Sequence, residues 1–234
     1  MKRIGLTMRI VHETAYSETR DALAHDWARF LSAALPDCQW IPLPNLSEAA
    51  TSIIHSFGIE ALIFTGGNDP GGSPMRDTTE KALLHEAMNR QIPVFGVCRG
   101  LQMIHWLLGG SLRPCSKQDH VGSHHEVRFL GRGSHSGARV VNSYHTLGVH
   151  PHDLASELKP HAMSPDGWVE ALIHRNAPIS AVQWHPERNA VIDTHDTQLL
   201  RETFGLPALT SLTHFSGTTT TRSSTLKSTS PCAP

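Results

Sequence analysis

One stretch of the sequence combines a reactive side chain with a setting that would expose it. Residues 94–97 form a short apolar run that predicts a buried strand. Cys98 follows directly, flanked at a distance of two residues by Gly96 and Gly100, and residues 101–108 have the periodicity of a helix. Such an elbow pushes a nucleophile out of the sheet, and the helix N-terminus favours both a thiolate and a nearby oxyanion. Taken alone, the pattern also fits a buried cysteine in an ordinary strand–helix joint.

A cysteine nucleophile needs a base that takes its proton and a partner that orients the base. His185 is the strongest candidate for the base, because it comes just after an apolar strand predicted at residues 179–183. Glu187 would project to the same side of an extended segment, and Pro186 stiffens the link between the two. A lone His–Glu pair is usually an ordinary surface ion pair. Together with the Cys98 elbow, however, the pair predicts a catalytic triad.

A glycine-rich loop over residues 65–72 follows an apolar strand predicted at residues 61–64. Ligands of open α/β sheets lie beyond the carboxyl ends of the strands, where glycines let the backbone approach closely. No G-x-G-x-x-G or Walker A pattern is present, so we do not expect a dinucleotide or P-loop site here. The loop is expected to approach a ligand, although a plain turn also fits its sequence.

Strand and helix patterns alternate through the first half of the chain. The predicted strands lie at residues 4–7, 40–43, 61–64 and 92–97. The predicted helices span residues 17–35, 47–57 and 77–90, with Ser17 and Ser47 as N-caps and a capping box from Asp77 to Glu80. This alternation predicts an α/β fold with a parallel sheet wrapped by helices.

The second half of the chain is richer in strand patterns. They lie at residues 125–130, 138–141, 160–164, 168–174 and 179–183, and a final helix is expected from Ala190 to Phe204. From Pro207 to Pro234, half of the 28 residues are Ser or Thr and none is acidic. We therefore expect one domain over residues 1–206 and a disordered tail over residues 207–234.

Length and composition exclude several classes of protein. The 234 residues carry a formal net charge of −1, so no basic surface for nucleic acid is indicated. The apolar runs are too short to cross a membrane, and the residues after the basic N-terminus do not form a signal peptide. Four cysteines without framework or Cys-x-x-Cys spacing indicate free thiols and a cytoplasmic protein.

Four blocks of the sequence together resemble the class I glutamine amidotransferase family. The blocks are Gly96–Gly100, Trp184–Glu187, Gly66–Asp69 and Asn142–His145, and the resemblance covers about residues 3–204. It implies a flavodoxin-like α/β fold, with a central, mostly parallel sheet flanked by helices. It also implies a cofactor-free reaction in which Cys98 is the nucleophile, His185 the base and Glu187 the residue that orients the base.

The same resemblance implies roles for residues around this triad. The oxyanion hole would be the backbone N–H of Arg99 together with an N–H of Gly67 or Asn68. The α-amino and α-carboxylate groups of a glutamyl substrate would be held by Gln102, Asn142, Ser143 and Tyr144. The expected ligand is therefore a small γ-glutamyl compound, and no nucleic acid or membrane partner is expected.

Within this family, the sequence resembles the free-standing γ-glutamyl hydrolases of peptidase family C26. Blocks typical of the γ-glutamyl-γ-aminobutyrate hydrolases lie at residues 64–69, 141–145 and 166–171, but the segment between Asp69 and Asp77 is shorter than theirs. The γ-glutamyl-CDP-amidate hydrolases are similar at residues 66–69, 76–77, 98–104, 120–122, 125–127 and 184–188. That second resemblance implies release of glutamate and cytidine diphosphoramidate in the biosynthesis of capsular polysaccharide. It also implies a nucleotide-linked substrate.

A histidine cluster and several arginines leave alternatives open. His120, His124 and His125 could form part of a zinc site, but no cysteine or carboxylate completes a convincing set, so we expect no metal. Three arginines, at positions 76, 99 and 188, could contact a phosphate or be solvated surface residues.

Two other functions also fit the family. One is a glutaminase subunit that passes ammonia to a synthase, and the other is a degenerate member that only binds glutamyl compounds or a protein. No synthase domain is fused to this sequence, so a synthase partner is not expected to be required. The presence of all three triad residues argues against a degenerate member.

Overall fold

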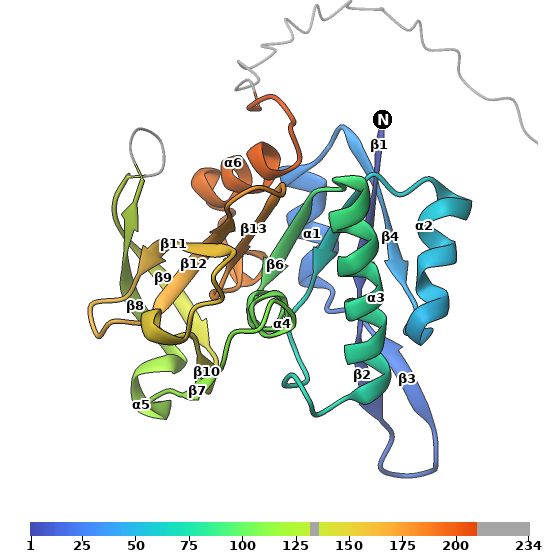
Figure 1. Cartoon of the computed structure of the whole chain (residues 1–234), viewed down its shortest axis with the longest axis horizontal. Helices are drawn as coiled ribbons and strands as arrows, with labels where there is room; N and C mark the ends of the chain where they lie inside the picture. The colour runs from blue at the N-terminus through green and yellow to red at the C-terminus, as the bar shows by residue number, and fades with distance from the viewer. Residues whose placement is uncertain (132–135, 210–234) are drawn as a thin grey trace, which may run out of the picture.

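The computed structural model describes residues 1–131 and 136–209 and has a layered α/β fold (Figure 1). In these residues the main sheet has nine strands, in the order β4 (Cys38–Leu43), β1 (Lys2–Thr7), β5 (Ala61–Phe64), β6 (Val94–Val97), β13 (Ile179–Val182), β12 (Val169–His174), β11 (Leu158–Met163), β8 (Val121–Leu130) and β9 (Ser136–Tyr144). The first five strands of this order are parallel. The remaining pairs are antiparallel, but β11 and β9 run in the same direction as the first five. The predicted mostly parallel sheet is therefore confirmed.

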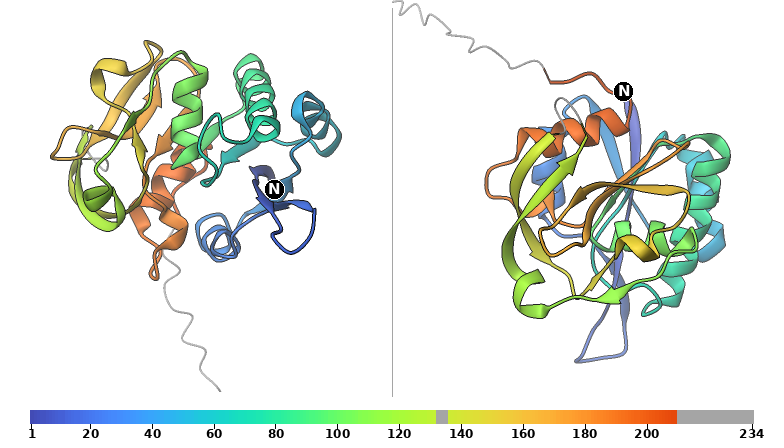
Figure 2. Two further views of the ribbon diagram at one scale, coloured as in Figure 1. Left: turned by 90° about the horizontal axis from the view of Figure 1, so that it is seen from below. Right: turned by 60° about the vertical axis from the view of Figure 1, so that its left-hand side comes forward.

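Helices cover both faces of the sheet (Figure 2). One face carries α1 (Asp26–Ala34) and α6 (Thr194–Thr203), and the other carries α2 (Thr51–Phe57), α3 (Pro74–Arg90) and α4 (Arg99–Leu107). Strand β5 is apolar throughout because its residues face both layers in alternation. Ala61 and Ile63 belong to the cluster beneath α1 and α6, whereas Leu62 and Phe64 belong to the cluster beneath the other three helices.

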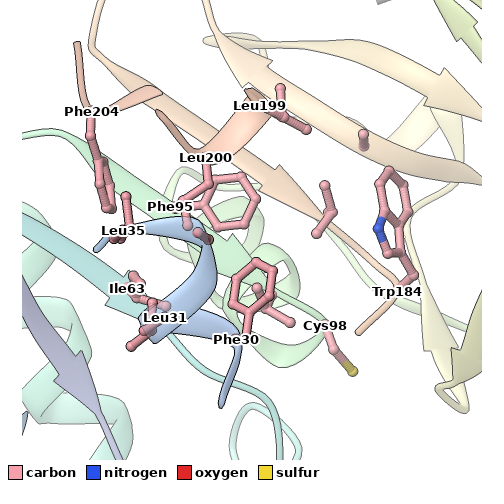
Figure 3. Packing of buried hydrophobic residues seen from close by; sticks show 14 of the residues in the cluster. Phe30, Leu31, Leu35, Ile63, Phe95, Cys98, Trp184, Leu199, Leu200 and Phe204 are labelled. Carbon is pink, nitrogen blue, oxygen red and sulfur yellow. The ribbon is translucent and has the colours of Figure 1, made fainter. Parts of the chain in front are cut away.

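The core on the α1 and α6 side fixes the backbone of the predicted nucleophile (Figure 3). Phe30, Phe95 and Leu200 lie in this cluster and are almost fully buried. Burial of a side chain of this size contributes about 1.5–3 kcal/mol. Cys98 lies at the margin of the same cluster, with its sulfur directed away from the aromatic rings. The core thus holds the Cys98 backbone in place and leaves the thiol at the cluster's edge.

A hairpin replaces the first part of the helix predicted from Ser17 to Leu35. Strands β2 (Arg9–His12) and β3 (Thr19–Ala22) pair antiparallel, and the helix begins only after them, as α1. The side chain of Asn68 accepts a hydrogen bond from the backbone N–H of Ile10 and donates one to its carbonyl, as a neighbouring strand would. The helix prediction is wrong here because long-range hydrogen bonds outweigh local propensity.

Two predicted helix caps are also wrong. Helix α3 begins at Pro74, so Asp77 and Glu80 lie inside the helix and do not form a capping box. The second helical segment begins as a 3-10 turn, η1 (Ser47–Ala50), in which Ser47 makes no capping hydrogen bond through its side chain. The N-cap residues are instead Ser73 for α3 and Leu46 for η1.

The C-terminal part of the chain agrees with the predicted last helix, apart from its start. Helix α6 begins at Thr194 and not at Ala190, because the side chain of Asp193 caps it. Residues 207–209 form neither helix nor strand. The rest of the predicted disordered tail, residues 210–234, lies outside the described residues.

Short elements join the strands of the second half. They are β7 (Arg113–Pro114), α5 (Lys117–His120), β10 (Leu147–Gly148), η3 (Pro151–Asp153) and η4 (Pro186–Arg188). Strands β7 and β10 pair with each other, separately from the main sheet. None of the helices within residues 1–131 and 136–209 has the length and apolar character needed to span a bilayer.

Candidate active site

The predicted nucleophile, Cys98, occupies a sharp elbow between β6 and α4. Its backbone has φ +52° and ψ −105°, a conformation that residues other than glycine rarely adopt. The next turn packs directly against a neighbouring strand, since a Cβ added at Gly100 would lie 2.1 Å from the carbonyl oxygen of Phe64. Only glycine fits at that position. The glycine spacing that predicted the elbow therefore has a steric cause.

His185 and Glu187 form the predicted pair of base and orienting carboxylate. Nδ1 of His185 lies 2.7 Å from Oε1 of Glu187, and both residues are 2% exposed. An extended segment was expected here, but the residues form the 3-10 turn η4. This turn still brings the two side chains together. Cys98 and His185 line one cavity. Because Nδ1 of His185 is engaged by Glu187, its Nε2 is the nitrogen that can exchange a proton with Cys98.

The surroundings of His185 favour its charged form. Burial lowers its pKa, but the charge of Cys98, a hydrogen bond with Cys98 and the Glu187 carboxylate outweigh burial and raise the pKa to about 9. At neutral pH, His185 is therefore an imidazolium. Such a group stabilises a thiolate at Cys98 and can donate a proton to a leaving group.

The glycine loop after β5 contributes to the same cavity as Cys98. Gly67 and Asn68 both have positive φ, and within the described residues neither backbone N–H donates a hydrogen bond. Arg99 is the first residue of α4, where backbone N–H groups have no partner inside the helix. Gly67 and Arg99 line the cavity together with Cys98. Their role as an oxyanion hole stays a prediction.

A buried arginine holds this loop from behind. Arg76 is fully buried, and its guanidinium donates to the backbone carbonyls of Thr65, Gly66 and Gly67. Anchoring these carbonyls fixes the path of the loop and hence the direction of its N–H groups. Neither alternative left open for Arg76, a phosphate contact or a solvated surface position, agrees with a guanidinium that is enclosed and engaged by the protein.

Glu80 joins Arg76 and Arg99 in one buried charge network. It accepts hydrogen bonds from both guanidinium groups, and Asp77 accepts another from Arg99. Burial raises the pKa of Glu80, but the two guanidinium groups outweigh burial and hold it below its usual value. Arg99 is 2% exposed, so it is not a solvated surface residue, which was one of the two alternatives left open for it. The i,i+4 spacing of Arg76 and Glu80 on one predicted helix could have indicated their ion pair from the sequence.

The cavity lined by Cys98 and His185 has a volume of about 320 Å³ and contains two further cations, Arg9 and Arg188. Arg9 belongs to β2, and its guanidinium lies against the loop, since a Cβ added at Gly67 would be 2.7 Å from its Nε. Arg188 stacks over the ring of Tyr144, with its Cζ 4.5 Å from the ring centroid. In the part of the chain that the structure describes, Arg9 forms no ion pair. Arg9 was not predicted at this site, because the hairpin that carries it was not predicted from the sequence.

Two of the four predicted glutamyl-binding residues have side chains in the cavity wall. Gln102 and Tyr144 both line the cavity. The amide nitrogen of Gln102 donates to the carbonyl oxygen of Leu147, and its amide oxygen has no hydrogen-bond partner among the described residues. Gln102 therefore has an acceptor available for an ammonium group.

The other two, Asn142 and Ser143, have side chains engaged by the protein. Asn142 accepts a hydrogen bond from the backbone N–H of His185 and donates one to its carbonyl oxygen. Ser143 is fully buried and donates to the carbonyl oxygen of His120. Both side chains position the wall of the site. Their contact with a substrate stays a prediction.

Next to the cavity, the structure brings together two of the three histidines for which the sequence offered no carboxylate, and it adds a third. His120, His125 and His145 surround the buried side chain of Glu170. The expectation that no carboxylate completes the set is wrong, because Glu170 reaches it from the separate strand β12. His124, in contrast, is exposed and is not part of the cluster.

Comparisons with known proteins bear on this site. Residues 4–187 match the family described as Peptidase C26. The chain is 31% identical over 209 residues to the γ-glutamyl-CDP-amidate hydrolase of Campylobacter jejuni, a match that covers 87% of this chain and 98% of that protein. It is 35% identical over 194 residues to the γ-glutamyl-γ-aminobutyrate hydrolase of Escherichia coli K12, covering 72% of each.

A structural comparison confirms the predicted fold. The crystal structure of a glutamine amidotransferase from Thermotoga maritima matches with a TM-score of 0.57 at 14% identity, over 87% of this chain and 82% of that one. The family match spans most of the chain and includes the Cys98 elbow, His185 and Glu187. The chain belongs to the peptidase C26 family of hydrolases, with the class I glutamine amidotransferase fold.

Proposed function

We propose that the chain is a cysteine-dependent γ-glutamyl hydrolase, which cleaves a linear amide C–N bond and releases glutamate. One observation carries the proposal: Cys98, His185 and Glu187 come together at a cavity of a size suited to a small ligand. Relatives named as hydrolases of γ-glutamyl compounds support the substrate class.

The proposed reaction uses the triad in order. The Cys98 thiolate attacks the γ-carbonyl carbon, and the backbone N–H groups of Arg99 and the Gly67–Asn68 turn stabilise the oxyanion, by about 3–4 kcal/mol for each donor. The His185 imidazolium gives its proton to the leaving nitrogen as the C–N bond breaks. Neutral His185 then takes a proton from a water molecule, which attacks the thioester carbon; the C–S bond breaks, glutamate leaves, and the thiolate and the imidazolium are restored.

We infer that the leaving group carries a nucleoside diphosphate, as in γ-glutamyl-CDP-amidate. Arg9 and Arg188 line the cavity, and neither is held by a close ion pair among the described residues. Charge-assisted hydrogen bonds from these two cations suit phosphate oxygens. The match to the Campylobacter jejuni protein covers nearly all of that relative, whereas the aminobutyrate hydrolase is longer.

The substrate preference tests the leaving group. We expect kcat/KM for γ-glutamyl-CDP-amidate to exceed the values for γ-glutamyl-γ-aminobutyrate and glutamine at least tenfold, measured as glutamate release. Binding of a remote group can orient the scissile bond, so the gain should appear in kcat as well as in KM. If the aminobutyrate compound is preferred, or glutamine is cleaved equally well, the nucleotide proposal is wrong while the hydrolase proposal stands.

A pair of variants locates the phosphate contact. Arg9→Gln should lower kcat/KM for the nucleotide substrate about 10- to 100-fold, the usual value of a charge-assisted hydrogen bond, and change glutamine hydrolysis little. Arg20→Gln is the matched control, because Arg20 lies on the same hairpin and pairs with Glu13 in solvent. Equal losses of Arg9→Gln on all substrates would instead assign Arg9 to the glutamyl α-carboxylate.

We also propose that hydrolysis needs no synthase partner and takes place in the cytoplasm. Cys38, Cys98 and Cys115 are all free thiols, which supports a reducing compartment. By the same likeness to the Campylobacter jejuni protein, the product would enter capsule biosynthesis. Glutamate release by the purified chain alone tests the first point, and a requirement for an added synthase would favour the glutaminase-subunit alternative.

A further inference from the structure

Three histidines and one glutamate converge at a point beside the catalytic cavity. Nδ1 of His120, Nε2 of His145 and a carboxylate oxygen of Glu170 all lie within 4.8 Å of one another. Nε2 of His125 lies 3.4 Å from the second oxygen of the same carboxylate. The four residues come from α5, β8, the end of β9 and β12, so the fold alone brings them together.

The atoms that face one another in this cluster have no hydrogen-bond partners among the described residues. His120, His145 and Glu170 are only 1%, 3% and 0% exposed. Oε1 of Glu170 is 4.0 Å from Nδ1 of His120 and 3.6 Å from Nε2 of His145, too far for a hydrogen bond. A buried carboxylate whose nearest possible donors are imidazole nitrogens at 3.4 to 4.0 Å is costly, so a proton on the rings or a bound cation would have to stabilise it.

The opposite nitrogen of each ring explains why no donor is available. The acceptors on that side are Asp166 Oδ2 at 2.9 Å for His120, the Leu147 carbonyl at 3.0 Å for His145 and, less closely, the Asp119 carbonyl at 3.5 Å for His125. A neutral imidazole that donates from one nitrogen presents a lone pair at the other. Three lone pairs and two carboxylate oxygens therefore point at the same place.

We propose that His120, His125, His145 and Glu170 bind a divalent metal ion of the zinc type. Imidazole nitrogen and carboxylate oxygen are ligands that Zn²⁺ accepts, and metal-bound histidines usually donate from their other nitrogen to a carboxylate or carbonyl, as these do. With bonds of about 2.0–2.1 Å, neighbouring ligands of a tetrahedral zinc ion are about 3.3 Å apart. The observed separations from the two Glu170 oxygens are 3.4, 3.6 and 4.0 Å, and the ligand atoms of His120, His145 and Glu170 lie within 4.8 Å of one another, so the ligands would move closer together on binding the ion.

Four protein ligands close the coordination shell, so the ion would be structural and not catalytic. Its role follows from what the ligands hold. His145 lines the catalytic cavity, and its backbone N–H and the Ser143 hydroxyl both donate to the carbonyl oxygen of His120. The ion would therefore fix the cavity wall that includes Tyr144.

The first test measures metal binding in the Cys98→Ala variant, so that the active-site thiol does not bind the added metal. The full chain is treated with a chelator, dialysed at pH 8 and titrated with Zn²⁺, and bound metal is counted by elemental analysis. We expect one ion per chain, a higher Tm and, with Co²⁺, the visible spectrum of a four-coordinate site. Protons compete little for imidazole at pH 8. If the chain binds no zinc at this pH, the proposal is wrong.

A matched pair of variants assigns the ion to this cluster. His125→Asn should weaken zinc binding at least tenfold, whereas His124→Asn, at the adjacent and exposed position of β8, should leave it unchanged. Glu170→Gln should weaken binding more strongly, with circular dichroism to confirm that the variant is folded. Equal affinities of His125→Asn and His124→Asn would show that the metal binds elsewhere.

Discussion

Two groups of buried ionisable side chains flank the catalytic cavity, and they compensate their charges differently. In the first half of the chain, Glu80 is satisfied by guanidinium groups from Arg76 and Arg99. In the second half, the imidazole nitrogens of the described residues lie 3.4 to 4.0 Å from the Glu170 carboxylate without the geometry of a hydrogen bond. In the first network, both carboxylate oxygens of Glu80 accept hydrogen bonds from within the chain. The second needs a proton or another cation to compensate its carboxylate.

This difference separates two tasks of the site. The Arg76–Glu80–Arg99 network anchors the glycine loop and the first residue of α4, both of which lie on the nucleophile side. The Glu170 cluster lies behind the wall that carries Tyr144, on the side where we expect substrate contacts. The nucleophile side is thus organised by the chain itself. The opposite wall would respond to the metal that we propose.

The largest effect is expected from removal of the nucleophile. Cys98→Ala should lower kcat by about 10⁴–10⁶-fold and leave the fold intact, because the change removes one sulfur atom at the margin of the core. His185→Ala should cost nearly as much and Glu187→Gln less. Glutamate release and circular dichroism measure the two properties. Substantial turnover by folded Cys98→Ala would contradict the triad assignment.

Substitution of each buried glutamate tests the comparison of the two clusters directly. Glu80→Gln should lower the free energy of unfolding by about 3–5 kcal/mol, because it leaves the buried Arg76 without its counter-charge and Arg99 with Asp77 alone. Glu170→Gln, measured with a chelator at pH 8, should cost less than about 1 kcal/mol, because the new amide can donate to neutral imidazoles. Urea denaturation of both variants and the wild type gives the two values.

Two outcomes of these measurements would contradict the expected difference between the two clusters. A large loss in Glu170→Gln, similar to that in Glu80→Gln, would mean that the histidines are protonated and already paired with the carboxylate. The two clusters would then be the same kind of ion-pair network. A small loss in Glu80→Gln would instead show that the arginines find other acceptors.

The features that the sequence predicted well are local in the chain. The Cys98 elbow follows from an apolar strand, two glycines and a helical repeat, and the steric need for Gly100 makes that spacing informative. The features that it missed join distant segments. Arg9 reaches the cavity only because Asn68 binds the hairpin, and Glu170 meets the histidines only because β12 lies close to them. The hydrophobic pattern within one segment cannot predict a contact between two distant segments.

The pH dependence of hydrolysis sharpens the description of the catalytic pair. The pKa of His185, raised to about 9, means that its ring loses the proton required by the leaving nitrogen only above that pH. We expect kcat/KM to fall on the alkaline side with a midpoint near 9. Glu187→Gln should move this limb to lower pH, because a neutral amide stabilises the imidazolium less. A limb that does not move would exclude Glu187 as a stabiliser of the charged ring.

The smallest effect concerns a third way of compensating a buried carboxylate, by a proton. Asp196 accepts a hydrogen bond from the Trp184 indole at 3.0 Å, and burial nevertheless raises its pKa from 3.8 to about 7. The folded state therefore keeps a proton that the unfolded state releases, so stability falls as the pH rises from about 4 through 7. Asp196→Asn retains an acceptor for Trp184 and cannot ionise. Its Tm should match that of the wild type near pH 4 and exceed it by a few degrees at pH 8, as calorimetry would measure. A Tm difference that is the same at both pH values would mean that Asp196 is already ionised in the folded protein, held by charge as Glu80 is.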